Sequence, residues 1–251
     1  MSAAIQGLRL VLLLLAVCFA SPGMAGNKVN INNATSVQSV TEVAFRSWLH
    51  GTCNLTYNST AIRMDCPGRG VVFLLKAPDW RMYYFKPTAK VYYDCPGKEF
   101  IPDDVKTFHA MRPSAPGALK PVSYSKDTLL GHPCTICKMV NPQAPTGKSQ
   151  HLWSRLIVRT GELWVDDVPG MPLEAAHTVQ RSLGLPYAKG IPWQMKTHNA
   201  NSVKEDEIKL YTIKTTKVPA SFFTMPPGFK RVKNPTAVGN NQDPEIYEIM
   251  R

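Results

Sequence analysis

The chain has 251 residues, 44% of them hydrophobic and 19% charged, which is enough for a sizeable core. It contains no internal repeat of fixed period and no low-complexity tract, which excludes a repeat array. The 29 Lys and Arg residues outnumber the 18 Asp and Glu residues, giving a formal net charge of +11 at pH 7. A charge of this sign favours anionic partners.

Residues 1–25 have the pattern of a cleavable secretory signal. The single cation Arg9 precedes an apolar run over residues 10–20, and small residues at Gly23 and Ala25 suit cleavage before Gly26. An uncleaved membrane anchor is the alternative, but a run of about 11 residues is shorter than the roughly 20 that a spanning helix needs. We therefore expect an exported protein, periplasmic or extracellular.

Cys18 adds a further alternative, because Leu15-Ala16-Val17-Cys18 has the outline of a bacterial lipoprotein signal. Val17 argues against acylation, since the residue before an acylated cysteine is normally small. Membrane association is therefore expected only if Cys18 is acylated or the signal stays uncleaved.

Residues 26–251 are expected to form a single β-rich domain. Two stretches rich in Pro, Gly and Ala, residues 112–117 and 141–147, are interpreted as long surface loops within it. Residues 36–44 are ambiguous between helix and strand.

Strand signals recur along the chain, separated by Pro and Gly. Residues 71–75 are wholly apolar, as expected of a strand covered on both faces. The other expected strands are 81–85, 90–93, 135–140, 152–159, 162–165, 192–196 and 208–218. Residues 86–89 predict a hairpin turn, and Thr160-Gly161 predicts another between 152–159 and 162–165.

One helix interrupts the strands. Pro172 suits a first helical position, and Gly184 suits the end. The apolar residues that recur on one face are Ala176, Val179 and Leu183. Such a helix can cover one face of a curved sheet, so the fold class is mainly β with one or two helices.

Seven short motifs follow one another between residues 71 and 232. They are Ala77-Pro78-Asp79-Trp80, Lys86-Pro87, Gly161-Glu162-Leu163-Trp164-Val165, Gly184-Leu185-Pro186, Lys189-Gly190-Ile191-Pro192, Val218-Pro219-Ala220-Ser221-Phe222-Phe223 and Pro227-Gly228-Phe229. Their arrangement resembles that of exported half-barrel proteins related to the outer-membrane lipoprotein carriers. The resemblance implies a strongly curved antiparallel sheet, a helix over its concave face and an apolar cavity between them. Long loops expected over residues 96–133 depart from the simplest version of that pattern.

Aromatic residues cluster between residues 80 and 93 and recur on later segments. Such residues can line an apolar pocket, although they more often serve as core or cross-strand packing. The candidate ligand-binding residues are Trp80, Tyr83, Phe85, Tyr92, Trp164 and Trp193.

Five cysteines follow the signal, an odd number in a compartment where disulfides persist. Cys53 and Cys66 flank a segment that can fold back, so a disulfide between them is the first expectation. Cys134 and Cys137 are the second candidate pair, and a bond from Cys95 to either of them is a close alternative. Residues 138–140, which follow this pair, are typical of a strand. Residues three apart on a strand point to opposite faces, which is a poor geometry for a bond between Cys134 and Cys137 outside a turn.

Signatures of enzymes and cofactor sites are missing from the sequence. Cys134-Thr135-Ile136-Cys137 lacks the βαβ context of a thiol-disulfide enzyme. His132 would add a third zinc ligand without a second cluster, and Lys138 stands where haem attachment needs a histidine. The pair Asp166-Asp167 is interpreted as a solvated turn. We therefore expect a non-enzymatic protein without a metal or cofactor.

The cations are scattered, and their densest group follows a Pro-Gly turn. The candidate anion-binding residues are Lys230, Arg231 and Lys233. After export the anionic partners would be lipid head groups or acidic envelope polymers, and no nucleic acid partner is expected.

These observations favour an exported binding protein that carries a lipid, a lipoprotein or another apolar or amphipathic ligand in the cell envelope. One alternative is an envelope interaction protein with a filled core and a basic surface for anionic polymers. The other is a C-x-x-C thiol-disulfide protein.

Overall fold

The computed structural model describes residues 36–111, 116–144, 157–199 and 203–239. The expected signal at residues 1–25, including Cys18, lies outside these ranges, as does Trp153 of the expected strand 152–159. Within them, no helix is long and apolar enough to cross a membrane.

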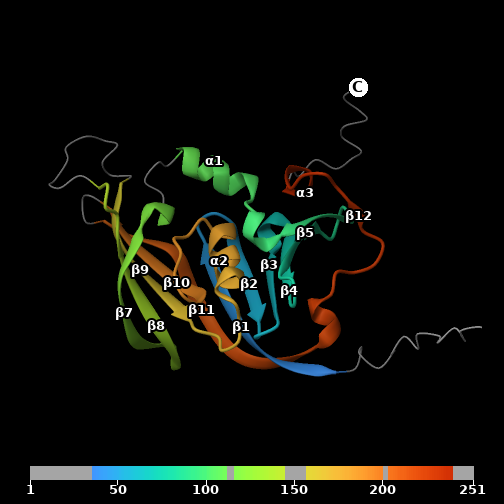
Figure 1. Ribbon diagram of the computed structural model, residues 1–251, viewed down its shortest axis with the longest axis horizontal. Helices are drawn as coiled ribbons and strands as arrows, with labels where there is room; N and C mark the ends of the chain where they lie inside the picture. The colour runs from blue at the N-terminus through green and yellow to red at the C-terminus, as the bar shows by residue number, and fades with distance from the viewer. Residues whose placement is uncertain (1–35, 112–115, 145–156, 200–202, 240–251) are drawn as a thin grey trace, which may run out of the picture. The chain divides into compact units, whose positions relative to one another are not determined.

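The described residues form one twelve-stranded sheet that curves without closing (Figure 1). Its strand order is β12-β6-β5-β4-β3-β2-β1-β11-β10-β9-β8-β7, and every pairing is antiparallel except that of β12 with β6. The strands are β1 (Val37–Ser47), β2 (Gly51–Tyr57), β3 (Ala61–Cys66), β4 (Val71–Lys76), β5 (Arg81–Lys86), β6 (Val91–Pro96), β7 (Lys120–Leu129), β8 (His132–Val140), β9 (Val158–Asp166), β10 (Ile191–Asn199), β11 (Lys204–Pro219) and β12 (Lys230–Arg231). The expected mainly-β half-barrel is confirmed.

Helix α2 (Leu173–Ser182) lies inside the curve of the sheet (Figure 1). Pro172 occupies its N-cap, one position before the expected one, and Gly184 follows its end with a φ of 69°. The helix buries Ala175, Ala176 and Val179, and so covers the concave face as expected. The other two α-helices in the described residues are α1 (Asp103–Met111) and α3 (Thr236–Gly239).

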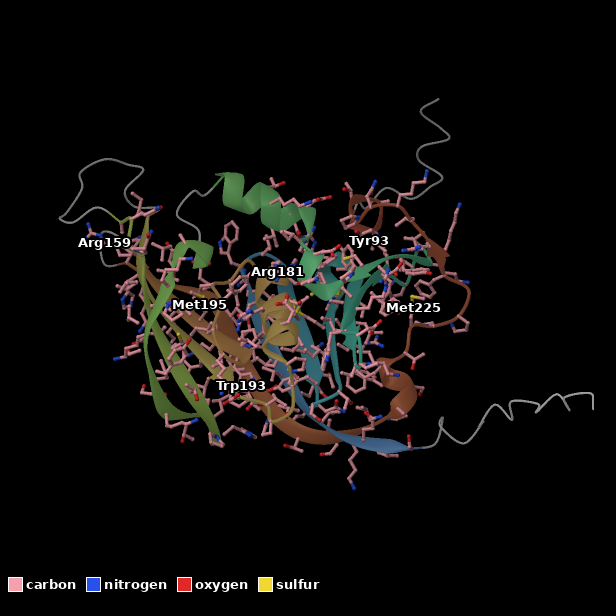
Figure 2. All side chains as sticks on the ribbon, in the orientation of Figure 1. Tyr93, Arg159, Arg181, Trp193, Met195 and Met225 are labelled. Atoms are coloured by element: carbon pink, nitrogen blue, oxygen red, sulfur yellow. The ribbon has the colours of Figure 1, made fainter. Side chains whose placement is uncertain are left out.

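Strand β4 is buried on both faces, as its unbroken apolar run predicted. Val71, Phe73 and Leu75 join the inner core, which includes α2, while Val72 and Leu74 join a smaller outer core. A C-terminal segment that contains Phe223 and Phe229 packs over the outer core, and we call this segment the outer cover. Figure 2 shows Met195 of the inner core within the curve and Met225 of the outer cover beyond β4.

The expected hairpin at Thr160-Gly161 is wrong, because β9 runs unbroken from Val158 to Asp166. Gly161 marks a close approach of chain segments instead of a turn. A Cβ added there would lie 2.7 Å from Cδ1 of Leu119 and 3.3 Å from Cε of Met195. The residue therefore makes room for packing on the concave face.

The long loops expected over residues 96–133 are also wrong, because this region contains α1 and β7. Asp103 and Asp104 in the first turn of α1 favour a helix N-terminus, a signal that the sequence did carry. The ambiguous residues 36–44 belong to strand β1.

Candidate functional site

An apolar groove opens between α1, the first residues of β7 and the loop that follows α2. Its volume is about 290 Å³. We call this site the α1 groove. The apolar side chains that line it are Ile101, Val105, Leu119, Pro121, Leu185, Pro186 and Tyr187.

Each wall of the α1 groove is held by local structure. Val105 and Leu119 are 1% exposed, and Leu119 belongs to the inner core, so these two side chains form the floor of the groove. Gly184 ends α2 in a left-handed conformation and lets Leu185 and Tyr187 turn toward α1. Ile101 and Tyr187 remain 38% and 47% exposed, which leaves apolar surface open to solvent at the rim.

Two cations, Arg181 and Lys120, stand at the groove. The guanidinium of Arg181 donates to the carbonyl oxygens of Gly97 at 3.0 Å and Lys98 at 2.6 Å, and to Tyr187 Oη at 2.8 Å. Arg181 therefore stabilises the chain segment at Gly97 and Lys98 and holds Tyr187 in place. Lys120 is exposed, so its charge faces solvent at the groove.

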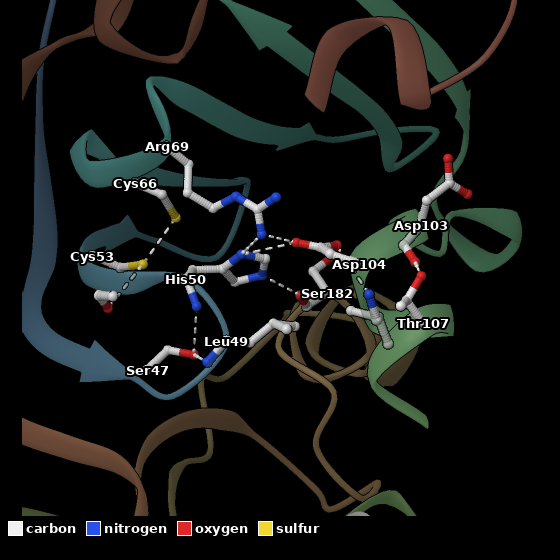
Figure 3. A network of polar contacts seen from close by, with 12 residues as sticks. Ser47, Leu49, His50, Cys53, Cys66, Arg69, Asp103, Asp104, Thr107 and Ser182 are labelled. Carbon is white, nitrogen blue, oxygen red and sulfur yellow. Dashed lines mark hydrogen bonds and ion pairs between the residues drawn. The ribbon is translucent and has the colours of Figure 1, made fainter. Parts of the chain in front are cut away.

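A partly buried polar network fixes α1 to the rest of the molecule (Figure 3). Arg69 pairs with Asp104 of α1, and His50 Nδ1 lies 3.5 Å from the same carboxylate. His50 Nε2 donates to the carbonyl oxygen of Ser182, the last residue of α2, at 2.7 Å. Through His50, this network links the positions of α1 and α2, which carry opposite walls of the α1 groove.

The environment of His50 disfavours its charged form. Burial lowers the pKa of His50, and the nearby Arg69 guanidinium adds to this, while Asp104 and the carbonyl of Ser182 oppose it. A neutral imidazole that donates from Nε2 leaves Nδ1 as an acceptor facing Arg69 Nη1, 3.5 Å away.

A second polar network lies where β2, β9 and β10 meet. Tyr57 donates from its hydroxyl to Asp166 at 2.7 Å and accepts from Trp193 Nε1 at 2.7 Å. Burial raises the pKa of both Tyr57 and Asp166. The interpretation of Asp166 as part of a solvated turn is therefore wrong, because this residue ends β9 with a hydrogen-bonded carboxylate. Its neighbour Asp167 pairs with Lys189 at 3.1 Å.

Two other hollows are lined mostly by residues that carry polar groups. One of about 370 Å³ lies beside β7, where Tyr124 is joined by Lys126, Thr135, Asp167 and Lys189. One of about 240 Å³ lies over the network of Tyr57 and Asp166, beside Ser39, Thr41, Asn58 and Thr215. Neither hollow is lined by as many aliphatic side chains as the α1 groove.

The six candidate ligand-binding aromatics do not gather in one place. Tyr83, Phe85 and Tyr92 belong to the outer core or pack against it, because alternate strand residues face opposite sides. Trp80, Trp164 and Trp193 pack in or against the inner core. Trp164 Nε1 donates a hydrogen bond to Asp127 at 3.0 Å, and Trp193 Nε1 donates one to the Tyr57 hydroxyl. None of the six lines the α1 groove.

The three candidate anion-binding residues follow the outer cover. Lys230 and Arg231 form β12, and Arg231 Nε pairs with Asp94 of β6 at 2.5 Å. Its charge therefore helps to fasten β12 to the edge of the sheet. Lys230 and Lys233 are exposed.

The five cysteines in the described residues are buried thiols. Cys53 on β2 and Cys66 on β3 bring their sulfurs to 2.8 Å. Cys134 and Cys137 lie within the extended strand β8, opposite Asp127 and Tyr124 of β7, and so point to opposite faces. The structure therefore brings the first candidate pair together and separates the second.

Sequence reasoning missed the α1 groove because its residues come from two unremarkable segments, 101–121 and 181–187. Each segment carries only scattered apolar residues. No group of three or more His, Cys, Asp or Glu residues within the described ranges could hold a metal ion.

Fold and site together define the class of the molecule, a mainly-β half-barrel with an apolar groove beside its helices. No family model matches the sequence, and no curated protein matches it. Solved structures that the chain matches include an uncharacterised conserved protein from Thermus thermophilus, with 10% identity and a TM-score of 0.31 over 80% of this chain and 93% of that chain.

Two further similar structures have TM-scores of 0.21. One is a LolA superfamily protein from Nitrosomonas europaea, 9% identical, with coverage of 76% of this chain and 91% of that chain. The other is a domain from Vibrio parahaemolyticus described as an outer membrane lipoprotein-sorting protein domain, 10% identical, with coverage of 71% and 84%.

Proposed function

We propose that this chain is an exported, non-enzymatic protein that binds the acyl chain of a lipid or a lipid-modified protein in the α1 groove. The observation that carries the proposal is the apolar lining of a groove that opens to solvent, with Ile101 and Tyr187 at its rim. Sites for small apolar ligands have this character, a mostly apolar concavity with a few polar groups that fix orientation.

The size of the groove limits what it takes up. Its volume of about 290 Å³ is close to the lower end of ligand sites, which span roughly 300–1,000 Å³. It therefore suits part of a single acyl chain, not a whole lipid. Five methylenes that leave water would contribute about 4 kcal/mol, at about 0.8 kcal/mol each.

Lys120 gives the bound molecule an orientation. Lys120 is exposed and lines the groove, whereas Arg181 is held by Tyr187 and by the carbonyl oxygens of Gly97 and Lys98. An anionic head group would lie against Lys120 while the chain enters between Ile101 and Leu185.

Binding of a fluorescent long-chain fatty acid tests the proposal. We expect saturable binding by the unmodified chain, and about tenfold weaker binding by Ile101→Asp, which corresponds to about 1.4 kcal/mol, because a carboxylate would be desolvated against the acyl chain. The matched control is Leu130→Asp, an exposed apolar residue beyond the other end of β7. Absence of saturable binding, or equal weakening by both variants, would contradict the proposal.

A charge reversal at Lys120 tests the orientation separately. Lys120→Glu should weaken binding of the fatty acid severalfold, while binding of the uncharged long-chain alcohol should change little. Equal losses for the acid and the alcohol would show that Lys120 does not contact the head group.

A further inference from the structure

Cys53 and Cys66 occupy directly opposed positions on neighbouring antiparallel strands. Asn54 pairs with Asp65, and Cys53 and Cys66 follow as the next pair outward from the hairpin. Both are 0% exposed, and their sulfurs lie 2.8 Å apart. Cβ atoms of opposed strand residues are about 4.5–5.5 Å apart, close to the range that a disulfide spans.

A metal ion or a ligand does not account for this contact. A zinc site needs more donors than two thiolates, and the described residues contain no cluster of three or more metal-binding side chains. Cys53 and Cys66 both belong to the inner core, so their sulfurs lie in a largely apolar setting.

We infer that Cys53 and Cys66 form a disulfide by exchange with a small disulfide donor, while Cys95, Cys134 and Cys137 remain thiols. In the first step one cysteine, as a thiolate, attacks the donor and displaces one donor thiolate, which leaves a mixed disulfide. In the second step the other cysteine loses its proton and attacks the mixed disulfide, closing the Cys53–Cys66 bond. The donor leaves as two thiols, having taken up the two electrons and two protons of the cysteine pair.

The positions of the other cysteines support this selectivity. Cys134 and Cys137 project from opposite faces of β8. Cys95 lies on β6, and β6 and β8 stand near opposite ends of the strand order. Because both sulfurs of the Cys53–Cys66 pair are buried, the bond should form before folding is complete and resist reduction afterwards.

The disulfide would also stabilise the polar network that holds α1 in place. His50 precedes Cys53 by three residues and Arg69 follows Cys66 by three residues, and both side chains approach Asp104 (Figure 3). A covalent link between their two segments would fix the distance between the groups that hold α1.

Peptide mapping tests the inference without any variant. The full chain is unfolded and refolded in a mixture of oxidised and reduced glutathione, alkylated in denaturant and digested without reduction. We expect a linked peptide pair containing Cys53 and Cys66, and alkylated Cys95, Cys134 and Cys137. Alkylated Cys53 or Cys66 as the main product, or a linked Cys134–Cys137 peptide, would overturn the inference.

Reduction of the refolded chain provides a second measurement. Dithiothreitol should reduce the Cys53–Cys66 bond at least tenfold more slowly in the folded chain than in guanidinium chloride. In Cys53→Ser, Cys66 should become alkylated in denaturant, whereas Cys134→Ser should leave the linked peptide intact. Loss of the linked peptide in Cys134→Ser would also overturn the inference.

Discussion

His50 lies at the turn between β1 and β2, where its two ring nitrogens perform different tasks. Nε2 donates to Ser182 of α2, while Nδ1 faces Arg69 and Asp104 of the network that holds α1. No sequence motif marks His50, which is buried at 3% exposure. Its partners come from residues 69, 104 and 182, which no local pattern connects.

Because burial lowers the pKa of His50 below its ordinary value of 6.5, the unfolded chain binds more protons near that pH than the folded chain does. Stability should therefore fall as the pH drops from about 7.5 through 6.5 and below. His50→Gln retains a donor toward Ser182 and removes the titration. Urea unfolding at several pH values should show a smaller acid-induced loss of unfolding free energy for this variant, and identical losses in both proteins would contradict the assignment.

At the scale of elements, the loop between α2 and β10 forms one wall of the α1 groove and is held from both ends. Gln180 of α2 donates to the carbonyl oxygens of Ala188 at 2.9 Å and Gly190 at 2.8 Å. Gly190 has a φ of 124°, and a Cβ added there would lie 2.4 Å from the carbonyl oxygen of Asp166. The loop can therefore reach β10 only with glycine at this position.

Gly190→Ala should lower the free energy of unfolding by about 3 kcal/mol or more, combining backbone strain with a clash against β9. Gly131→Ala is the matched control, because its φ is 82° but nothing lies within 4 Å of the added Cβ. That control should cost about 1–2 kcal/mol. Urea denaturation measures both, and equal costs would show that the approach of Asp166 is unimportant.

The same elements show what sequence could and could not predict. Strand β4 and helix α2 were predictable, because a run of five apolar residues and a capped amphipathic segment are local signals. Gly161 was misread because one glycine serves a turn and a close approach equally well. The α1 groove could not be predicted, since Ile101, Leu119 and Leu185 become neighbours only through tertiary packing.

At the scale of the whole described unit, the sheet is covered on both sides, by helices within the curve and by a C-terminal segment outside it. Phe223 is 1% exposed and belongs to the outer core, together with Val72, Leu74 and Phe85. Phe222 is only half-buried beneath the Arg63 guanidinium, which lies 4.6 Å from its ring centroid. The outer cover is therefore an integral part of the fold.

Phe223→Ala should lower the free energy of unfolding by about 3–5 kcal/mol, since it leaves a cavity between the cover and β4. Phe222→Ala should cost about 1 kcal/mol, because its ring remains partly in water. Chemical denaturation of the two variants checks the ratio. Similar small costs would mean that the C-terminal segment adds little to the stability of the sheet.

The joint between β1 and β11 has a consequence for the order of events during folding. It pairs residues 37–47 with residues 208–219, so its contacts span more than half of the sequence. The strands from β2 to β6 can pair with their immediate neighbours as soon as each hairpin exists, whereas the joint must wait for β11. We therefore expect this junction to form more slowly than the hairpins. Until β11 is present, one edge of β1 has no strand to pair with.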